Sequence, residues 1–351
     1  VSSPACLKGM WMLRFRVLRF VAVTVAGLLL LFFLVDFVGL EEVYQVVSNM
    51  DHRIFVLAPA SAMVSSHVYI YAWYVLLRGL GLPLGFKEAW KVMWCNIFVD
   101  QVLPSGSIGG EATRIMLLSK VTPDSVGEGL ATIVVHRICS TVPFLAACLV
   151  GLVYFTFYLG VGPLAMLLVL ILYLPIFIVA LILAALVLYP GEAETIVDFL
   201  FKFLLASGFL RETLNAWRGR MLRIVRSYSE GLRLMSKHMP SVILSLFLSF
   251  TSFIFEILTV KLVFTSIGIC LPVVSVIFIY SVGMMLQSAP TMIPGVPEVG
   301  VTYILSNIGL DPPEAAWSAI LNRLSTFWVR LIVGGLTFTF LLADIYGNKK
   351  I

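Results

Sequence analysis

Polar side chains interrupt an apolar stretch of the chain near residue 100, and their types suit the binding of an anion. They flank a turn with glycines at 106, 109 and 110. Glycine lets backbone N–H groups approach a ligand, and a helix beginning near Ile108 would point its positive end at the turn. Such an arrangement can hold a phosphate. The candidate binding residues are Asn96, Asp100, Gln101, Ser105, Glu111 and Arg114.

The same residues also have a purely structural interpretation. Glycine and proline would then only make the turn, while Glu111 caps the first helical turn and pairs with Arg114 three residues later. The sequence leaves these two interpretations open. A nucleotide-binding loop is not expected, because the pattern Gly-x-x-x-x-Gly-Lys-Ser/Thr is absent.

A second polar group lies near residue 290. It contributes Gln287 and Glu298 on either side of a turn that prolines stiffen, and Asn322 with Arg323 follow in the next helix. Arg323 and its counterpart Arg137 each lie nine residues after a glutamate, roughly 13 Å into a membrane helix.

Deep arginines need partners. An arginine near the bilayer centre costs about 2.5–3.5 kcal/mol, so each should face a carboxylate, a polar cavity or a ligand phosphate. Glu256, which is deep in another apolar run, is a candidate partner. The alternative is that each side chain snorkels to the interface. The paired occurrence of Arg137 and Arg323 favours binding.

The elements that must position these groups are membrane helices. The 351 residues are 60% hydrophobic and only 12% charged, with a mean hydropathy of +1.02, which leaves too little polar surface for a water-soluble globule. Since a span needs about 20 apolar residues, we expect an all-α polytopic protein with six crossings. The predicted crossings are 17–40, 54–78, 128–159, 163–189, 239–265 and 314–343.

Two further apolar segments are too short for ordinary crossings. Residues 88–120 and 272–308 each consist of an apolar stretch, a Gly/Pro turn and a short helix. About ten helical residues span roughly 15 Å, half of a hydrocarbon core. We therefore predict two re-entrant helical hairpins.

The chain also contains an internal repeat. Leu82-Pro83, Pro104, Glu128 and Arg137 recur in the same order as Leu271-Pro272, Pro294, Glu314 and Arg323, shifted by 186 to 190 residues. Within a single membrane domain covering 1–351, the predicted copies are 52–159 and 238–344. Helix 163–189 links them, so the second copy enters the membrane from the opposite face and the repeats are inverted.

Charge placement predicts the topology. Between the copies, residues 190–237 form a basic, amphipathic segment in which Arg211 to Lys237 carries a net charge of +5. The positive-inside rule places this segment and both termini in the cytoplasm of a multi-pass cell-membrane protein. The segment is either an ordinary loop or an interfacial helix on anionic lipid. Its candidate lipid-surface residues are Arg211, Arg218, Arg220, Arg223 and Arg226.

The five cysteines and four histidines are scattered singly, so neither a metal site nor a disulfide framework is expected. No cofactor and no catalytic residue is predicted. Nothing in the charge pattern indicates binding of nucleic acid.

These residues resemble the membrane region of the lysylphosphatidylglycerol synthase/flippase family over roughly residues 10–345. The resemblance rests on Asn96, Leu103-Pro104, Gly109-Gly110-Glu111-x-x-Arg114, Arg137, Pro294-Gly295, Gly300, Gly309 and Arg323. It implies a membrane domain that moves lipids, without the soluble aminoacyltransferase domain that makes aminoacyl lipids in some members. Pro297-Glu298 departs from a hairpin that is usually richer in glycine, with its acid a turn later.

The sequence therefore favours a lipid translocase for a polar-headed or phosphate-containing lipid over an enzyme. An ion-coupled transporter of a small solute, or a membrane subunit of a lipid-modifying or lipid-linked sugar enzyme, are the alternatives. The expected partners are membrane lipids, anionic lipid among them. A homo-oligomer and a separate lipid-synthesising enzyme are left open as further partners.

The topology can be tested by labelling single cysteines in a variant that lacks the native ones. Cysteines placed at Arg220 and Lys349 should be unreactive toward an impermeant maleimide in intact cells and should react after lysis, because both positions are predicted to be cytoplasmic. A cysteine at Asp311, predicted on the outer side, serves as the control. Labelling of positions 220 and 349 from outside would overturn the topology.

Overall fold

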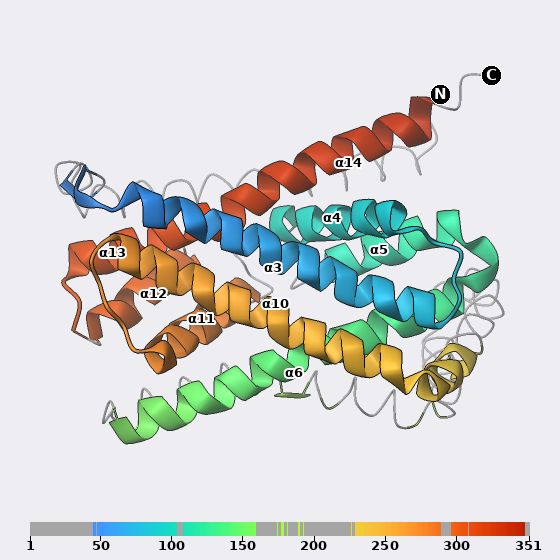
Figure 1. Ribbon diagram of the computed structural model, residues 1–351, viewed down its shortest axis with the longest axis horizontal. Coiled ribbons are helices and arrows are strands. Elements are labelled where there is room, and N and C mark those ends of the chain that lie inside the picture. The colour runs from blue at the N-terminus through green and yellow to red at the C-terminus, as the bar shows by residue number, and fades with distance from the viewer. Residues whose placement is uncertain are drawn as a thin grey trace, which may run out of the picture.

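The computed structural model describes residues 45–46, 48–103, 108–158, 174, 177–178, 181, 189, 192, 226, 229–288, 296–307 and 309–347. Every element named within these residues is a helix (Figure 1). The first half contains α3 (His52–Gly79), α4 (Phe86–Val102), α5 (Ile108–Val121), the 3₁₀ turn η1 (Pro123–Ser125) and α6 (Val126–Tyr158). The second half contains α10 (Met239–Ser266), α11 (Val273–Ser288), α12 (Val296–Asn307), α13 (Pro312–Arg323), the π-helix η2 (Leu324–Trp328) and α14 (Val329–Gly347).

Four helices are long and apolar enough to cross a membrane, and each coincides with a predicted span. They are His52–Gly79, Pro123–Tyr154, Met239–Ser266 and Pro312–Leu341. The fold class, an all-α polytopic membrane protein, is confirmed. The predicted spans 17–40 and 163–189, and most of the basic segment 190–237, lie outside the described residues except for isolated positions and the helical stretch 229–237.

The two segments predicted as hairpins are pairs of short helices. Helices α4, α5, α11 and α12 contain 17, 14, 16 and 12 residues. At 1.5 Å per residue they measure roughly 18–26 Å, less than the ~30 Å hydrocarbon core. Helix α4 packs against α5, and α11 packs against α12.

The centre of the fold is the antiparallel pair α3 and α10, each 28 residues long (Figure 1). At one end the Asp51 N–H donates to the Ser266 carbonyl at 2.7 Å. At the other end Gly79 lies against Ser241, where a Cβ on the glycine would fall 2.7 Å from the serine hydroxyl. The two helices therefore stay in contact along their whole length.

Small side chains allow this close approach. Ala58, Ser61, Ala62, Ser65 and Ser66 of α3 are buried, as are Ser245, Ser249 and Ser252 of α10. Without a hydrophobic driving force between membrane helices, close packing of small residues and interhelical hydrogen bonds hold them together.

A reciprocal contact lies at the middle of this pair. Ser65 Oγ donates to the Ser252 carbonyl at 3.0 Å, and Ser252 Oγ donates to the Ser65 carbonyl at 3.1 Å. The two serines are 187 residues apart in sequence. Gly81 and Gly268, which end the turns after α3 and α10 with φ of 67° and 81°, are separated by the same interval. A two-fold axis through the serines would relate inverted copies in this way.

The remaining helices of each half pack against helices of the other half. Helix α4 of the first half packs on α14 of the second, and α11 of the second packs on α6 of the first. Figure 1 shows α6 and α14 on opposite sides of the central pair. These relations are the ones that an inverted duplication would produce. The boundaries of the copies stay a prediction.

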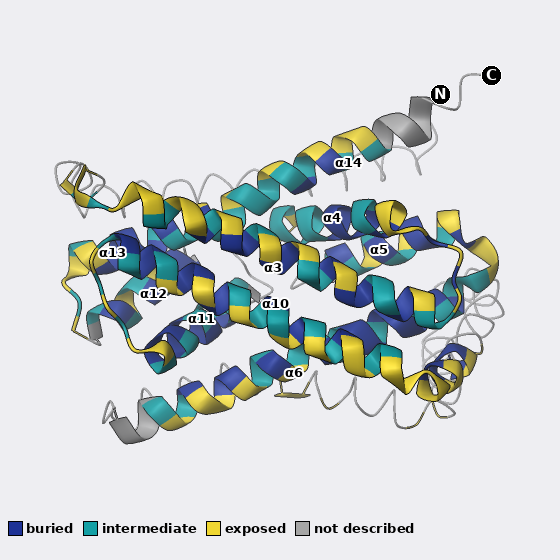
Figure 2. Cartoon of the chain, viewed as in Figure 1, coloured by how far each residue is buried: buried dark blue, intermediate teal, exposed yellow. Residues whose placement is uncertain are grey.

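Figure 2 shows which residues of the helices are exposed and which are buried. Many large exposed residues are apolar, while many of the buried residues are polar. Phe247, Ile254 and Phe340 are each more than 60% exposed, whereas Arg114 and Thr259 are fully buried. This distribution suits a lipid solvent, in which polar groups must find partners inside the protein.

The second long helix of each half is interrupted at a corresponding place. Helix α6 contains Pro143, and the helix from Pro312 to Gly347 contains η2. A proline removes a backbone donor, and a π turn inserts an additional residue into the helix. Both devices disturb the regular hydrogen-bond ladder.

The reciprocal serine contact predicts a disulfide. In a cysteine-free background, Ser65→Cys combined with Ser252→Cys should cross-link on mild oxidation, because the two hydroxyl oxygens are 3.0 Å apart. Mass spectrometry of the linked peptides measures the yield. The control pair is Ser65→Cys with Thr251→Cys, since the Thr251 hydroxyl bonds within its own helix. Equal yields for the two pairs would refute the register of α3 against α10.

Candidate functional site

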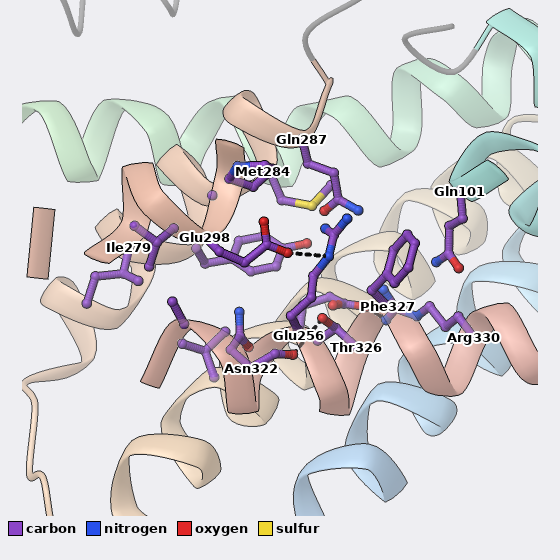
Figure 3. Close-up of a pocket in the computed structure, with 17 residues that line it drawn as sticks. Gln101, Glu256, Ile279, Met284, Gln287, Glu298, Asn322, Thr326, Phe327 and Arg330 are labelled. Atoms are coloured by element: carbon purple, nitrogen blue, oxygen red, sulfur yellow. Dashed lines mark hydrogen bonds and ion pairs between the residues drawn. The ribbon is translucent and has the colours of Figure 1, made fainter. Parts of the chain in front are cut away.

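The candidate site is a cavity of about 60 Å³ that residues of the second half line, together with Gln101 of the first half (Figure 3). Gln101 reaches it from α4 of the first half, and Gln287 and Glu298 reach it from α11 and α12 of the second. The other polar lining residues are Glu256, Tyr280, Asn322, Arg323, Thr326 and Arg330. The flanks of both predicted hairpins therefore meet at one cavity.

Two charged residues of the cavity lie far from the ends of the long apolar spans Met239–Ser266 and Pro312–Leu341. Glu256 precedes the end of α10 at Ser266 by ten residues, and Arg323 follows the start of α13 at Pro312 by eleven. At 1.5 Å per residue both positions are roughly 15 Å from a helix end, which is half the thickness of a hydrocarbon core.

Arg323 forms an ion pair with Glu298. Its Nε lies 2.9 Å from Glu298 Oε1, and the two side chains are 12% and 4% exposed (Figure 3). The guanidinium carbon also lies 3.9 Å from the centre of the Phe327 ring, one turn further along the helix. Arg323 thus faces a carboxylate and a polar cavity, as predicted for a deep arginine.

A second ion pair joins Arg330 to Glu256. Arg330 also donates from Nε to Ser66 Oγ at 3.0 Å and from Nη2 to the Ala62 carbonyl at 3.4 Å. Glu256 Oε1 also accepts from Ser65 Oγ at 2.5 Å, so the single hydroxyl proton of Ser65 is shared between this carboxylate and the Ser252 carbonyl. This pair ties α14 to the crossing of α3 and α10.

Unpartnered polar atoms add binding capacity to the cavity. Gln101 Oε1 and Asn322 Oδ1 are buried and have no hydrogen-bond partner. Buried amides usually have partners, so these two oxygens are available to a ligand or to water.

The first half holds a separate polar cluster. Arg114 is fully buried, pairs with Glu111 at 3.4 Å and stacks 3.9 Å from the centre of a Trp73 ring. Its Nε and Nη2 have no partner. Arg137 hydrogen-bonds to Tyr69 and is within electrostatic reach of Glu111.

The turn of the first hairpin is closed by Asp100. Its Oδ1 accepts a hydrogen bond from the Gly110 N–H at 2.8 Å. A Cβ on Gly110 would lie 2.4 Å from the Asp100 carboxyl and 2.5 Å from Asn96 Nδ2, so only glycine fits here. The i,i+3 pair of Glu111 and Arg114 expected on structural grounds is present as well.

The predicted binding residues therefore divide into two groups. The cavity contains Gln101, Gln287, Glu298, Asn322 and Arg323. The first-half cluster contains Asn96, Asp100, Glu111, Arg114 and Arg137. Ser105 and the predicted lipid-surface residues Arg211, Arg218, Arg220 and Arg223 lie outside the described residues, and Arg226 is helical and exposed.

Sequence reasoning missed Arg330. It gave Glu256 as a partner for a deep arginine, and the structure gives Glu256 that role with Arg330. The signal was available, because Arg330 interrupts an apolar run seven residues after Arg323. The position of the first copy that corresponds to Arg330 is not an arginine, so the repeat did not indicate Arg330.

Comparison with known proteins identifies the family. The family model "Lysylphosphatidylglycerol synthase TM region" matches residues 18–334. The chain belongs to this family. A UPF0104 membrane protein of Methanocaldococcus jannaschii is 23% identical over 96% of this chain and 99% of its own length.

Other members of the family from archaea are similar over most of their length. UPF0104 membrane proteins of Methanothermobacter thermautotrophicus and Pyrococcus horikoshii are 21% and 20% identical, covering 88% and 89% of this chain and 92% and 94% of their own. No solved structure matches the chain. The names of these family members identify membrane proteins and state no activity.

The Glu298–Arg323 pair can be tested by a double-mutant cycle. Glu298→Gln or Arg323→Gln alone leaves one charge in the cavity without its partner, whereas the double variant leaves none. The thermal midpoint of the double variant should therefore fall by less than the sum of the single falls, with a coupling of about 0.5–3 kcal/mol. Glu314→Gln with Arg233→Gln, both exposed, should be additive. Additivity at Glu298 and Arg323 would disprove the pair.

Proposed function

We propose that the protein is a lipid translocase, which moves a lipid with a polar or phosphate-containing head group across the membrane. The observation that carries the proposal is the polar cavity lined by Arg323 and Arg330, to which the first half contributes Gln101. The positions of Glu256 and Arg323 along their long helices support a depth near the middle of the bilayer. Membership of the family supports a role in the membrane and names no substrate.

The cavity has the chemistry for a phosphate head group. A guanidinium offers a planar fork of donors that matches phosphate oxygens, and such bonds are strong where water is scarce. Gln101 and Asn322 present buried amide groups beside the arginines. Amides can donate to and accept from hydroxyl or amine groups on the rest of a head group.

The size of the cavity agrees with a lipid substrate. Since one water needs about 10–15 Å³ of such space, a cavity of about 60 Å³ holds a few waters and no complete lipid. The acyl or isoprenoid tails would stay in the surrounding bilayer, along the apolar outer surface. Only the head group would pass the arginines.

An inverted repeat would explain how the cavity serves both leaflets. Two copies related by an axis in the membrane plane can exchange conformations, so the inward-facing and outward-facing states resemble each other. The contact of Ser65 with Ser252 would lie on such an axis, and Ser65 hydrogen-bonds to Glu256 of the cavity.

The proposal predicts a defect in transport when the arginines are replaced. Arg323→Gln in the cavity, and Arg137→Gln in the first-half cluster that the sequence also assigns to binding, should each slow the translocation of a fluorescent phospholipid in proteoliposomes by at least about tenfold, equivalent to about 1.4 kcal/mol of barrier. Arg323→Lys should recover part of the rate, because lysine keeps the charge and loses the bidentate geometry. Dithionite quenching of the outer leaflet measures the rate.

Arg233→Gln is the matched control, since Arg233 is exposed on the helical stretch 229–237. Size-exclusion profiles and thermal midpoints must show that each variant folds. If the folded Arg323 and Arg137 variants translocate lipid like the parent, both arginines are structural. The binding-site assignment would then be wrong.

A further inference from the structure

The charged groups that line the cavity balance each other. Glu256 and Glu298 contribute two negative charges, and Arg323 and Arg330 contribute two positive ones. The other described lining residues carry no formal charge. The cavity is therefore neutral before a ligand enters.

An anionic head group would upset this balance. Each arginine already has a carboxylate partner, so a phosphate brings one negative charge that no group of the cavity offsets. A net charge in a medium of low polarity is strongly disfavoured. A cation that enters with the phosphate would restore neutrality.

We propose that this cation is a proton and that Glu256 carries it, so that one proton moves with each negative charge of the lipid head group. The inference rests on the proposed function, and it assigns the energy source of that function. The carboxylate of Glu256 becomes a carboxylic acid, and the Arg330 guanidinium exchanges that carboxylate for a phosphate oxygen. When the lipid leaves, the proton returns to water and the ion pair forms again.

The contacts favour Glu256 over Glu298 as the carrier. The hydrogen bonds from Arg330 and Ser65 to Glu256 both fall on Oε1, which leaves Oε2 to take a proton. Arg330 keeps two further acceptors, Ser66 Oγ and the Ala62 carbonyl, when its carboxylate partner is neutralised. The hydrogen-bond network around the pair therefore survives protonation.

Its place in the fold also distinguishes Glu256. It hydrogen-bonds to Ser65, which would lie on the two-fold axis of an inverted repeat, so Glu256 would stay near the axis in both states. The residue 187 positions earlier is Tyr69, which hydrogen-bonds to Arg137. The carboxylate therefore occurs in one copy alone, which predicts one proton-binding group at the axis.

Few titratable groups surround Glu256. Arg330 faces it from α14, Tyr280 from α11, and the pair of Arg323 and Glu298 shares its cavity from α13 and α12. From α3 it meets the hydroxyl of Ser65. In the proposed step Arg330 keeps its charge and exchanges its anionic partner, from the Glu256 carboxylate to the phosphate.

The experiment uses the full chain in proteoliposomes that contain a pH-sensitive dye and acyl-labelled fluorescent phosphatidylglycerol, whose head group carries one negative charge. With a gradient of one pH unit, the labelled lipid should collect in the leaflet that faces the alkaline side. The limiting ratio between leaflets is about tenfold for one proton per lipid. The dye should report proton entry, and a valinomycin-imposed potential should leave the ratio unchanged, because no net charge moves.

Glu256→Gln should abolish the leaflet bias and the dye signal, with a size-exclusion profile and thermal midpoint showing that the variant is folded. The matched control is Glu314→Gln, an exposed carboxylate that should behave like the parent. Labelled phosphatidylcholine, whose head group is neutral overall, should show no bias with the parent protein.

Two results would overturn the inference and leave the proposed function standing: lipid movement by the parent without a bias under the pH gradient, or an unchanged bias in Glu256→Gln. A bias that depends on voltage would also overturn it, because coupling would then move charge. Absence of any lipid movement by the folded parent would overturn the proposed function itself, and the inference with it.

Discussion

The close antiparallel contact of α3 and α10 is the constraint on which the rest of the structure depends. Their backbones approach because serine and alanine fill the interface, and Ser65 and Ser252 exchange hydrogen bonds at its centre. In a lipid solvent such bonds and close packing replace the hydrophobic effect between helices. The exchanged packing of α4 on α14 and of α11 on α6 is arranged around this pair.

The charged groups follow from the same constraint. Arg330 reaches across the α3–α10 crossing to bond with Ser66, Ala62 and Glu256. Arg323 is held a short distance away by Glu298 of the second hairpin. Both arginines of the cavity are thus placed where the central pair or a hairpin supplies a carboxylate partner. Arg114 pairs with Glu111, although two of its nitrogens have no partner.

The sequence predicted the parts of the fold that depend on long apolar runs. Four crossings and both short helix pairs could be placed within a few residues, because length and hydropathy determine them. The site was only partly predictable. The occurrence of one arginine in each predicted copy, Arg137 and Arg323, indicated charges deep in the membrane. Which carboxylate faces which arginine depends on tertiary packing. Glu256 pairs with Arg330 for this reason, and no sequence interval connects them in a repeating pattern.

Because a π-helix lies between Arg323 and Arg330, a change in that turn would alter the orientation of Arg330 about the helix axis without moving Arg323. One residue more than a regular helix needs is accommodated over Leu324–Trp328. If that turn relaxed to α-helical spacing, everything after it would rotate by about 100°, because a helix has 3.6 residues per turn. Such a rotation would swing Arg330 off Glu256 and leave Arg323 in place. Pro143 offers the first half no comparable change, since a missing backbone N–H cannot be restored. Both halves therefore interrupt the hydrogen-bond ladder of this helix, but only the second half could change its helical register.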